Sequence, residues 1–387
     1  MLRLRWMTLL LTALATAVVL SACGSSSDST TSGSTESAGE GGSASTDLAQ
    51  LETLVKEKEE PVTKWPSGLP TEPVKKIEPN KLVVDIALSP EEPASLSTAE
   101  GVVEAAEAIG WDSKILYTEF SAAKTAAAFE QAIALGADAV VTQGIEPQGY
   151  KSSIKRLHDA GGILVTTYSD YPPSDEYAQA EVNHNSVGYG QLSAAKMIVD
   201  AGGEGQFAGF FYPEFQAVRT VAKAFEDEMA KCSGCELLPI IDVSAAEAEK
   251  TLPAATSTLL QQNPDLTGDY SHLDTFLFNL QLPVFRQQQS EAGVYTTLGS
   301  KATLEAVDKG EINAVVEFPL TWGGWAAVDN IARIFAGQKA NNGPGIPQRI
   351  VDKDNVQEVM TSLGPNGYWE ADGFDYKGEY EKFWGLK

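Results

Sequence analysis

Two cysteines separated by two residues, Cys232 and Cys235, form a pair that could carry chemistry. An exported protein usually holds such a pair as a disulfide, and Gly234 suits the tight turn between the two residues. A redox pair would stand at the start of a helix, whereas this pair follows an expected helix at 217–230 and precedes an expected strand at 237–243. A zinc site needs further ligands, and the histidines are scattered, at His158, His184 and His272. We predict a disulfide and no metal site, with redox chemistry and metal binding as the alternatives.

The motifs of common enzyme classes are absent from the sequence. It contains neither a Gly-x-Ser-x-Gly nucleophile elbow nor a His-Glu-x-x-His zinc helix. No glycine-rich phosphate loop follows the first expected strand, where Ser-Pro-Glu-Glu-Pro stands at residues 89–93. Carboxylates are numerous, but no local pair stands out that would mark a glycosidase. We therefore expect a protein that has no cofactor and is not an enzyme.

The first residues have the features of an export signal. Arg3 and Arg5 precede an apolar run at 6–20, which is short for a membrane-spanning helix. The Leu-Ser-Ala-Cys sequence that ends at Cys23 resembles the bacterial lipobox, in which the cysteine is acylated and the chain is cut just before it. Two or three acyl chains hold a protein firmly at a membrane. We predict a signal peptide at 1–22 and a lipid anchor on Cys23, with an ordinary cleaved signal as the alternative.

Two segments of distinct composition follow the signal. Residues 23–47 are mostly Gly, Ser, Thr, Ala, Asp and Glu, which cannot bury enough apolar surface to fold, so we expect a flexible tether. Residues 48–80 contain a short amphipathic stretch at 48–58 and then several prolines. We interpret this second segment as a lead-in that lies over the surface of the folded part.

The charge of the chain limits which partners are expected, and its length limits which architectures are expected. It has 53 Asp and Glu against 28 Lys and Arg, a formal net charge of −25. Such a charge repels a phosphate polymer, so nucleic acid is not expected as a partner. No long apolar run follows Cys23, so the mature chain is not expected to span a membrane. The roughly 340 residues after the signal and tether exceed what one hydrophobic core usually serves, which predicts two lobes.

From Lys81 onward, short apolar strands alternate with helical patterns, and glycines such as Gly110 and Gly136 follow the helices as stop signals. The expected strands are 82–88, 114–118, 137–142, 163–167, 206–211, 237–243, 269–273, 294–297 and 314–318. The expected helices are 98–109, 123–135, 147–160, 186–200, 217–230, 253–262, 276–290, 302–309 and 322–335, with Pro253 at the first position of its helix. This alternation predicts an α/β fold with parallel sheets. The pattern restarts near Asn185, which indicates two similar Rossmann-like lobes.

Five segments carry a resemblance to a known family. They are Gly-Gly-Ile-Leu-Val-Thr-Thr-Tyr-Ser-Asp at 161–170, Asn-Ser-Val-Gly-Tyr-Gly at 185–190, Arg219 ahead of Ala-Phe at 224–225, Leu-Leu-Gln-Gln-Asn-Pro-Asp at 259–265, and Gly-Glu-Ile-Asn-Ala-Val-Val-Glu-Phe-Pro at 310–319. Together they resemble the type I periplasmic sugar-binding proteins, the ribose- and galactose-binding group that delivers solutes to ABC transporters. The resemblance runs from about residue 81 to residue 354.

The resemblance implies a periplasmic binding protein of type I, whose two lobes are joined by a hinge and close around a solute. The N-terminal lobe would comprise 81–184 and 319–346, and the C-terminal lobe 185–318 and 347–387. The protein would be a monomer that binds a sugar or sugar-like solute and hands it to an ABC transporter permease. Its place would be the extracytoplasmic face of the cell membrane.

The resemblance also implies a set of solute contacts. They are Glu92, Ser169, Asp170, Arg219, Asp274 and Glu317. Arg219 matches the family's pocket arginine, whose planar fork suits adjacent hydroxyls. Asp274 lies at the family's Asn-Asp pair, and Glu317 stands about where a hinge glutamine often binds the sugar.

The remaining contacts are implied by their place in the family's loops. Ser169 and Asp170 occupy the position of an Asp-Arg loop, and Glu92 falls near an asparagine that follows the first strand. Tyr168 and Trp322 match no aromatic position of the family, but they are further candidate contacts, because flat rings suit the apolar faces of a sugar; packing at the start of a helix is the alternative for Trp322. The family's paired aromatics are absent from the first loop, so the identity of the sugar stays open.

Two other functions remain as alternatives. A two-lobed clamp of this kind also serves as a sensory module that presents its ligand to a membrane receptor. A surface glycosidase is a further alternative. A DNA-binding repressor with two such lobes is excluded by the export signal and the acidic charge.

Overall fold

The computed structural model describes residues 48–343 and 345–387. The expected signal peptide, the lipid anchor on Cys23 and the tether lie outside the described residues. Within the described ranges, no helix combines the length and the apolar character needed to span a membrane.

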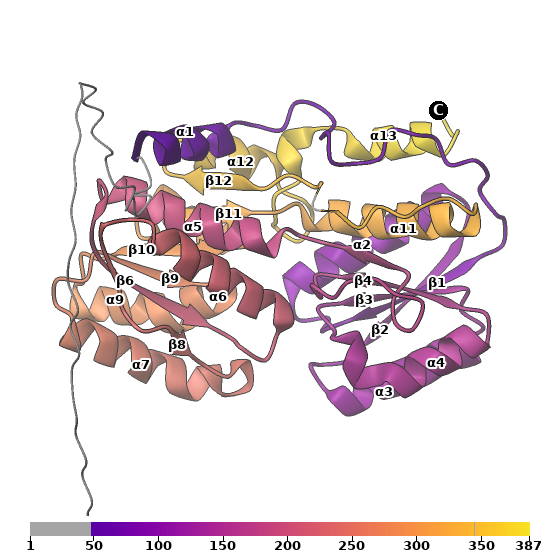
Figure 1. Ribbon diagram of the computed structural model, residues 1–387, viewed down its shortest axis with the longest axis horizontal. Coiled ribbons are helices and arrows are strands. Elements are labelled where there is room, and N and C mark those ends of the chain that lie inside the picture. The colour runs from indigo at the N-terminus through magenta and orange to yellow at the C-terminus, as the bar shows by residue number, and fades with distance from the viewer. Residues whose placement is uncertain (1–47, 344) are drawn as a thin grey trace, which may run out of the picture. The chain divides into compact units, whose positions relative to one another are not determined.

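The first sheet consists of five parallel strands in the order β2-β1-β3-β4-β5 (Figure 1). The strands are β1 Leu82–Ala87, β2 Asp112–Tyr117, β3 Ala139–Gln143, β4 Ile163–Thr167 and β5 Ala180–Val182, and the covering helices are α2 Pro93–Ala108, α3 Ala122–Ala134, α4 Lys151–Asp159 and α11 Leu320–Phe335. Neighbouring residues of β1 face opposite layers, because side chains alternate along a strand. Val83 packs in the core that contains Val102 of α2, and Val84 packs in the core that contains Phe129 of α3.

The second sheet has the order β12-β11-β10-β9-β6-β7, with β8 paired to β6. Its strands are β6 Glu204–Phe211, β7 Gly234–Leu237, β8 Ile241–Asp242, β9 Gly268–Ser271, β10 Gly293–Thr297, β11 Ala314–Glu317 and β12 Arg349–Asp352, and its helices include α5 Ser186–Asp200, α6 Gln216–Met229, α7 Ala248–Gln262, α8 Asp274–Phe276, α9 Leu282–Gln288 and α10 Lys301–Asp308. Only β12 runs antiparallel, against β11. The predicted α/β fold with two lobes and parallel sheets is confirmed.

Several elements differ from the sequence prediction. Helix α7 begins at Ala248, so Pro253 lies inside it and not at its first position. The carbonyl that Pro253 leaves without an N–H partner belongs to Glu249, an exposed residue where water can bind it. The strand expected at 237–243 is divided into β7 and β8 around Pro239, which has no N–H for the ladder. The helix expected at 276–290 contains a π-helical turn, Leu277–Gln281.

The lead-in and the C-terminal segment pack together along the two lobes. Helix α1, Leu48–Glu59, lies beside α5 and β12 and buries Leu51 and Val55. Asp372 joins the two segments, because its carboxylate accepts from the Val62 N–H at 2.8 Å and from the buried guanidinium of Arg349.

The last helix packs on a different lobe from the one to which the sequence analysis assigned it. Helix α13, Tyr376–Phe383, packs on α11 of the N-terminal lobe, although 347–387 was assigned to the other lobe (Figure 1). The indole of Trp384, just after α13, stacks on Trp325 of α11 with ring centroids 5.3 Å apart. This aromatic contact provides the physical reason for the difference.

Cys232 and Cys235 are bonded as a disulfide between α6 and β7, with their Cα atoms 5.3 Å apart. The described residues contain no group of three or more His, Cys, Asp or Glu side chains placed to hold a metal ion.

Candidate functional site

Polar side chains gather where the parallel strands of both lobes end. Gln143 ends β3, His272 follows β9 and Glu317 ends β11, and all three side chains are buried. Ligands of open parallel sheets bind beyond the carboxyl ends of the strands. The two sets of strand ends therefore define the candidate binding site.

The chain passes between the lobes at residues 183–185, at 318–319 and between α11 and β12. Two of these crossings are joined by hydrogen bonds, since the Gln348 amide donates to the carbonyls of His184 and Asn185 at 3.0 and 3.1 Å. Asn185 adopts a left-handed conformation, and its side chain accepts from the Gly188 N–H at the start of α5. These contacts connect two crossings at the position where the sequence predicts the hinge.

Glu317 and Asp274 both lie against the loop of Gly299 and Ser300 in the C-terminal lobe. The Ser300 N–H and the Thr303 hydroxyl donate to Asp274 Oδ2 at 2.8 and 2.9 Å. Gly299 precedes Ser300 and lies so close to Glu317 that a Cβ on it would be 2.4 Å from Glu317 Oε1. The structure thus brings together two of the residues predicted as solute contacts.

Glu317 is fully buried, and neither of its carboxylate oxygens has a hydrogen-bond partner among the described residues. Burial raises the pKa of Glu317 well above its usual value, and the charge of Asp274 adds to this effect. The backbone N–H of Gly299 offsets part of the rise, although it forms no hydrogen bond of normal geometry. An unpaired buried carboxylate costs several kcal/mol, so its presence at the strand ends points to a ligand.

Glu92 faces this pair from the N-terminal lobe. It lies just before α2 and is partly buried. Burial and then the charge of Asp274 raise the pKa of Glu92 to about 7. Glu92, Asp274 and Glu317 are called here the acidic cluster.

Tyr368 lies near the acidic cluster, and two buried histidines lie against the ring of Tyr189. The Tyr368 hydroxyl is buried without a hydrogen-bond partner, and its pKa is raised by burial and by all three carboxyls of the cluster. Burial lowers the pKa of His184 to about 4 and that of His272 to about 3, so both rings are neutral at physiological pH. The sequence reasoning identified none of these three residues.

Tyr168, Ser169 and Asp170 form a strained loop after β4, in which Tyr168 and Asp170 have positive φ. The carboxylate of Glu181 holds the loop, because it accepts from the Ser169 N–H at 2.8 Å, the Ser169 hydroxyl at 2.7 Å and the Asp170 N–H at 3.2 Å. Asp170 Oδ1 accepts from the Asn183 amide at 2.9 Å. Glu181 thus positions the loop that was predicted to contact the solute.

Trp322 does not stand as an open platform for a sugar ring. Its indole is fully buried and stacks on Tyr376 with ring centroids 4.5 Å apart. The ring centroid of Trp65 lies 5.7 Å from that of Trp322, and Trp322 Nε1 donates to the Tyr380 hydroxyl at 3.2 Å. Because side chains of the lead-in and C-terminal segments occupy this ring, we withdraw Trp322 from the expected solute contacts.

Arg219 lies apart from the acidic cluster and joins the two lobes. Its Nη2 donates to Glu146 Oε1 at 3.0 Å, and the Gln216 N–H donates to the same oxygen at 3.0 Å. The Tyr171 hydroxyl donates to Glu146 Oε2 at 2.9 Å. Glu146 and Tyr171 belong to the N-terminal lobe and the other two residues to α6, so these four residues are called the lobe bridge.

Replacing Arg219 by Ala is expected to weaken solute binding about tenfold, or about 1.4 kcal/mol, because the closed form loses an ion pair between the lobes. Calorimetry measures the change, with Glu146→Ala and the double variant in parallel. Lys223→Ala is the matched control, since Lys223 pairs with Asp227 on its own helix. Wild-type affinity in Arg219→Ala, or full additivity of the two losses, would contradict this role.

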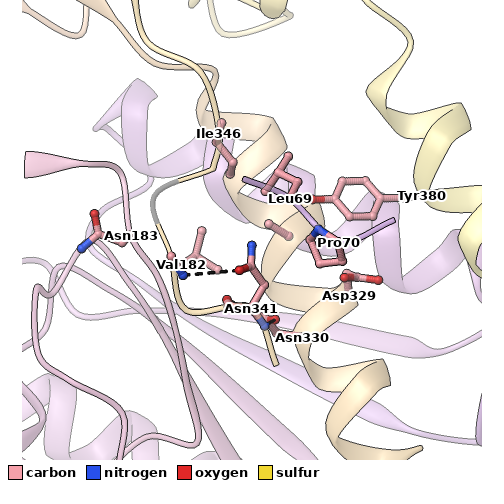
Figure 2. Close-up of a pocket in the computed structure, with 11 residues that line it drawn as sticks. Leu69, Pro70, Val182, Asn183, Asp329, Asn330, Asn341, Ile346 and Tyr380 are labelled. Carbon is pink, nitrogen blue, oxygen red and sulfur yellow. Dashed lines mark hydrogen bonds between the residues drawn. The ribbon is translucent and has the colours of Figure 1, made fainter. Parts of the chain in front are cut away.

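A small cavity lies between α11 and the lead-in segment (Figure 2). Figure 2 shows Leu69, Pro70, Asp329 and Tyr380 around it. Its volume of about 10 Å³ admits about one water molecule. The cavity is therefore too small for a sugar and is not the candidate site.

The unfolding free energy of the unliganded protein is expected to fall by several kcal/mol as the pH rises from about 5 to about 8. Burial raises the pKa of Asp85 and Glu181 to about 7 and that of Asp274 to about 6, so these carboxyls stabilise the fold while they are protonated. The lowered pKa values of His184 and His272 oppose this trend only below the usual histidine pKa. Urea unfolding at a series of pH values measures the slope, and stability that rises over this window would contradict the assignment.

The comparisons with known proteins agree with this geometry. Residues 93–339 match a family model described as a periplasmic binding protein domain. A comparison with curated proteins finds no match. Because the family model covers more than half of the chain, the protein belongs to the periplasmic binding protein family, and its two-lobed architecture is that of type I.

Solved structures share the fold at low sequence identity. An ABC sugar transporter subunit from Rhodobacter sphaeroides is 19% identical, with a TM-score of 0.63 over 71% of this chain and 99% of that chain. An ABC transporter solute-binding protein from Agrobacterium vitis with bound allitol is 18% identical, with a TM-score of 0.66 over 73% of this chain and 99% of the other. A solute-binding protein from Actinobacillus succinogenes with bound D-allose is 15% identical, with a TM-score of 0.63 over 72% and 99%.

Proposed function

We propose that this protein is the solute-binding component of an ABC transporter and binds a sugar or a sugar-like solute between its two lobes. The observation that carries the proposal is the set of buried polar side chains at the facing strand ends, above all the unpartnered carboxylate of Glu317. Polyhydroxylated solutes offer many donors, and carboxylates accept them well. The sugar and polyol ligands of the structural neighbours support the same class of solute.

A thermal-unfolding screen tests the solute class. The full-length protein is unfolded in the presence of sugars, polyols, nucleosides and small acids, and tryptophan fluorescence reports the transition. A ligand at one hundred times its Kd adds about 2.7 kcal/mol to the stability of the folded state. Stabilisation by a sugar or polyol supports the proposal, whereas a response to nucleosides or acids alone would contradict it.

Transport is separated from sensing by an uptake measurement. Cells that lack the protein are expected to lose uptake of the radiolabelled solute, and the wild-type protein is expected to restore it. Normal uptake together with loss of a transcriptional response to the solute would instead favour the sensory function.

The proposal includes a lipid anchor on Cys23 that holds the protein at the extracytoplasmic face of the membrane. Cys23→Ala is expected to release most of the protein into the soluble fraction, because acyl chains supply about 0.8 kcal/mol per buried methylene. Immunoblots of membrane and soluble fractions measure the distribution, with Cys232→Ala as the control. Retention of Cys23→Ala in the membrane would contradict the anchor.

A further inference from the structure

Within the part of the chain that the structure describes, the acidic cluster has no counter-charge. Among residues 48–343 and 345–387, no ion pair includes Glu92, Asp274 or Glu317. Arg219, the basic residue expected in the pocket, instead pairs with Glu146 in the lobe bridge at 3.0 Å.

The basic side chains that are buried elsewhere have their own partners. Lys196 pairs with Asp352 at 2.8 Å, and Arg333 pairs with Asp329 at 2.6 Å. Arg349 pairs with Asp372 between the lead-in and C-terminal segments. None of these ion pairs involves a carboxylate of the acidic cluster.

The geometry places the three carboxyl groups around one region. Asp274 and Glu317 meet at the loop of Gly299 and Ser300, as described above, and Glu92 faces Asp274 from the other lobe. Asp274 has two protein donors for its carboxylate, the N–H of Ser300 and the hydroxyl of Thr303. Glu317 is fully buried, and among the described residues its carboxylate has no cation and no hydrogen bond of normal geometry.

A neutral sugar would not balance this site electrostatically. Its hydroxyls could donate hydrogen bonds, but each carboxyl would then either have to stay protonated or keep an uncompensated negative charge when the lobes close. A protonated amine supplies three N–H donors and one positive charge at the same point. Hydrogen bonds between an ammonium and a carboxylate are shorter and stronger than those between neutral groups.

We propose that the natural ligand is a hydroxylated solute that carries a protonated amine, such as an amino sugar, and that the amine binds Glu317 and Asp274. The hydroxyl of Tyr368, buried without a partner, lies near the same carboxyls and supplies a further polar contact. This inference rests on the proposed function, because it names the class of solute for the same site.

Matched ligands that differ only in charge test the inference. The full-length protein is titrated near neutral pH with D-glucosamine and D-galactosamine, with the parent hexoses, and with the N-acetyl derivatives, which lack the positive charge. Calorimetry gives the affinities. At least one amine is expected to bind at least tenfold more tightly than its parent sugar, which corresponds to about 1.4 kcal/mol. Acetylation of that amine is expected to remove the gain.

Variants link the preference to the acidic cluster. Glu317→Gln is expected to reduce the ratio of amine to neutral-sugar affinity, because it removes the charge and keeps the shape. Glu291→Gln is the control, since Glu291 is exposed near the opposite end of β10. An unchanged ratio in Glu317→Gln would overturn the assignment of the amine to this cluster.

The outcomes separate this inference from the proposed function. Equal or tighter binding of a neutral sugar would overturn the charged ligand and leave the sugar-binding function intact. Binding of none of the amines, hexoses or N-acetyl sugars would count against both.

Discussion

Replacing Glu317 by Gln is expected to stabilise the unliganded protein at neutral and alkaline pH and to weaken solute binding about a hundredfold, or about 2.8 kcal/mol. The stability gain follows because the variant removes a carboxyl whose ionisation is opposed in the folded state by burial and by Asp274, whereas it ionises freely in the unfolded chain. The binding loss follows because an amide offers one acceptor oxygen and no charge, whereas a carboxylate accepts through both oxygens. Urea unfolding and calorimetry measure the two changes on the same preparations.

The variant is expected to gain stability and to lose affinity, and this combination distinguishes a binding residue from a residue that only supports the fold. A variant that merely disturbed the fold would lose stability and affinity together. Glu291→Gln provides the baseline for removing one surface carboxylate, and it should change neither quantity by more than about 0.5 kcal/mol. Unchanged affinity in Glu317→Gln would show that Glu317 is outside the binding site.

Replacing Glu181 by Ala is expected to destabilise the protein by about 3–5 kcal/mol. Its carboxylate accepts hydrogen bonds from two N–H groups and two hydroxyls of Thr166, Ser169 and Asp170. The variant would remove the acceptor of the buried Ser169 N–H and hydroxyl, whereas the Thr166 hydroxyl would keep the Ala180 carbonyl. Denaturant unfolding gives the loss. Glu181→Gln, which keeps one acceptor oxygen, should lose less than half as much.

The same variant tests how the loop is positioned. Tyr168 and Asp170 have positive φ, a conformation that costs free energy in a residue with a side chain and that the Glu181 contacts maintain. Glu181→Ala should therefore also weaken solute binding, with the larger effect on stability. A variant with wild-type stability would show that Glu181 does not hold this loop.

The fold could be predicted well from the sequence because buried parallel strands are short continuous apolar runs. Ile163–Thr167 and Ser186–Asp200 were predicted with the bounds that the structure shows. The strands β5 and β12 were missed, since each has no more than four residues and β12 has a charged residue at both ends. Their pairing depends on neighbouring strands and not on local pattern.

The candidate site could be predicted only in part. Asp274 and Glu317 lie together because Glu317 ends β11 and Asp274 follows β9, the two strands adjacent to β10, and strand order is implied by the fold. Tyr368 lies beyond the region of family resemblance, so no pattern marked it. Two residues separate Glu146 from the end of β3. Its position just beyond a predicted strand could therefore have marked it as a candidate.

Arg219 and Trp322 show why residue type alone does not assign a role. Both are typical of sugar sites, yet their partners come from distant parts of the chain. Glu146 turns Arg219 toward the junction of the lobes, and the stacked ring of Tyr376 encloses Trp322. Local sequence around either residue contains no sign of these contacts, because they depend on how remote segments pack.

The most direct test of the central claim is a crystal structure of the full-length protein with the sugar or amino sugar that stabilises it most. The account predicts that the solute lies between the strand ends of the two lobes and contacts Asp274 and Glu317. A solute bound elsewhere on the protein, with these two carboxylates still free of it, would contradict the account.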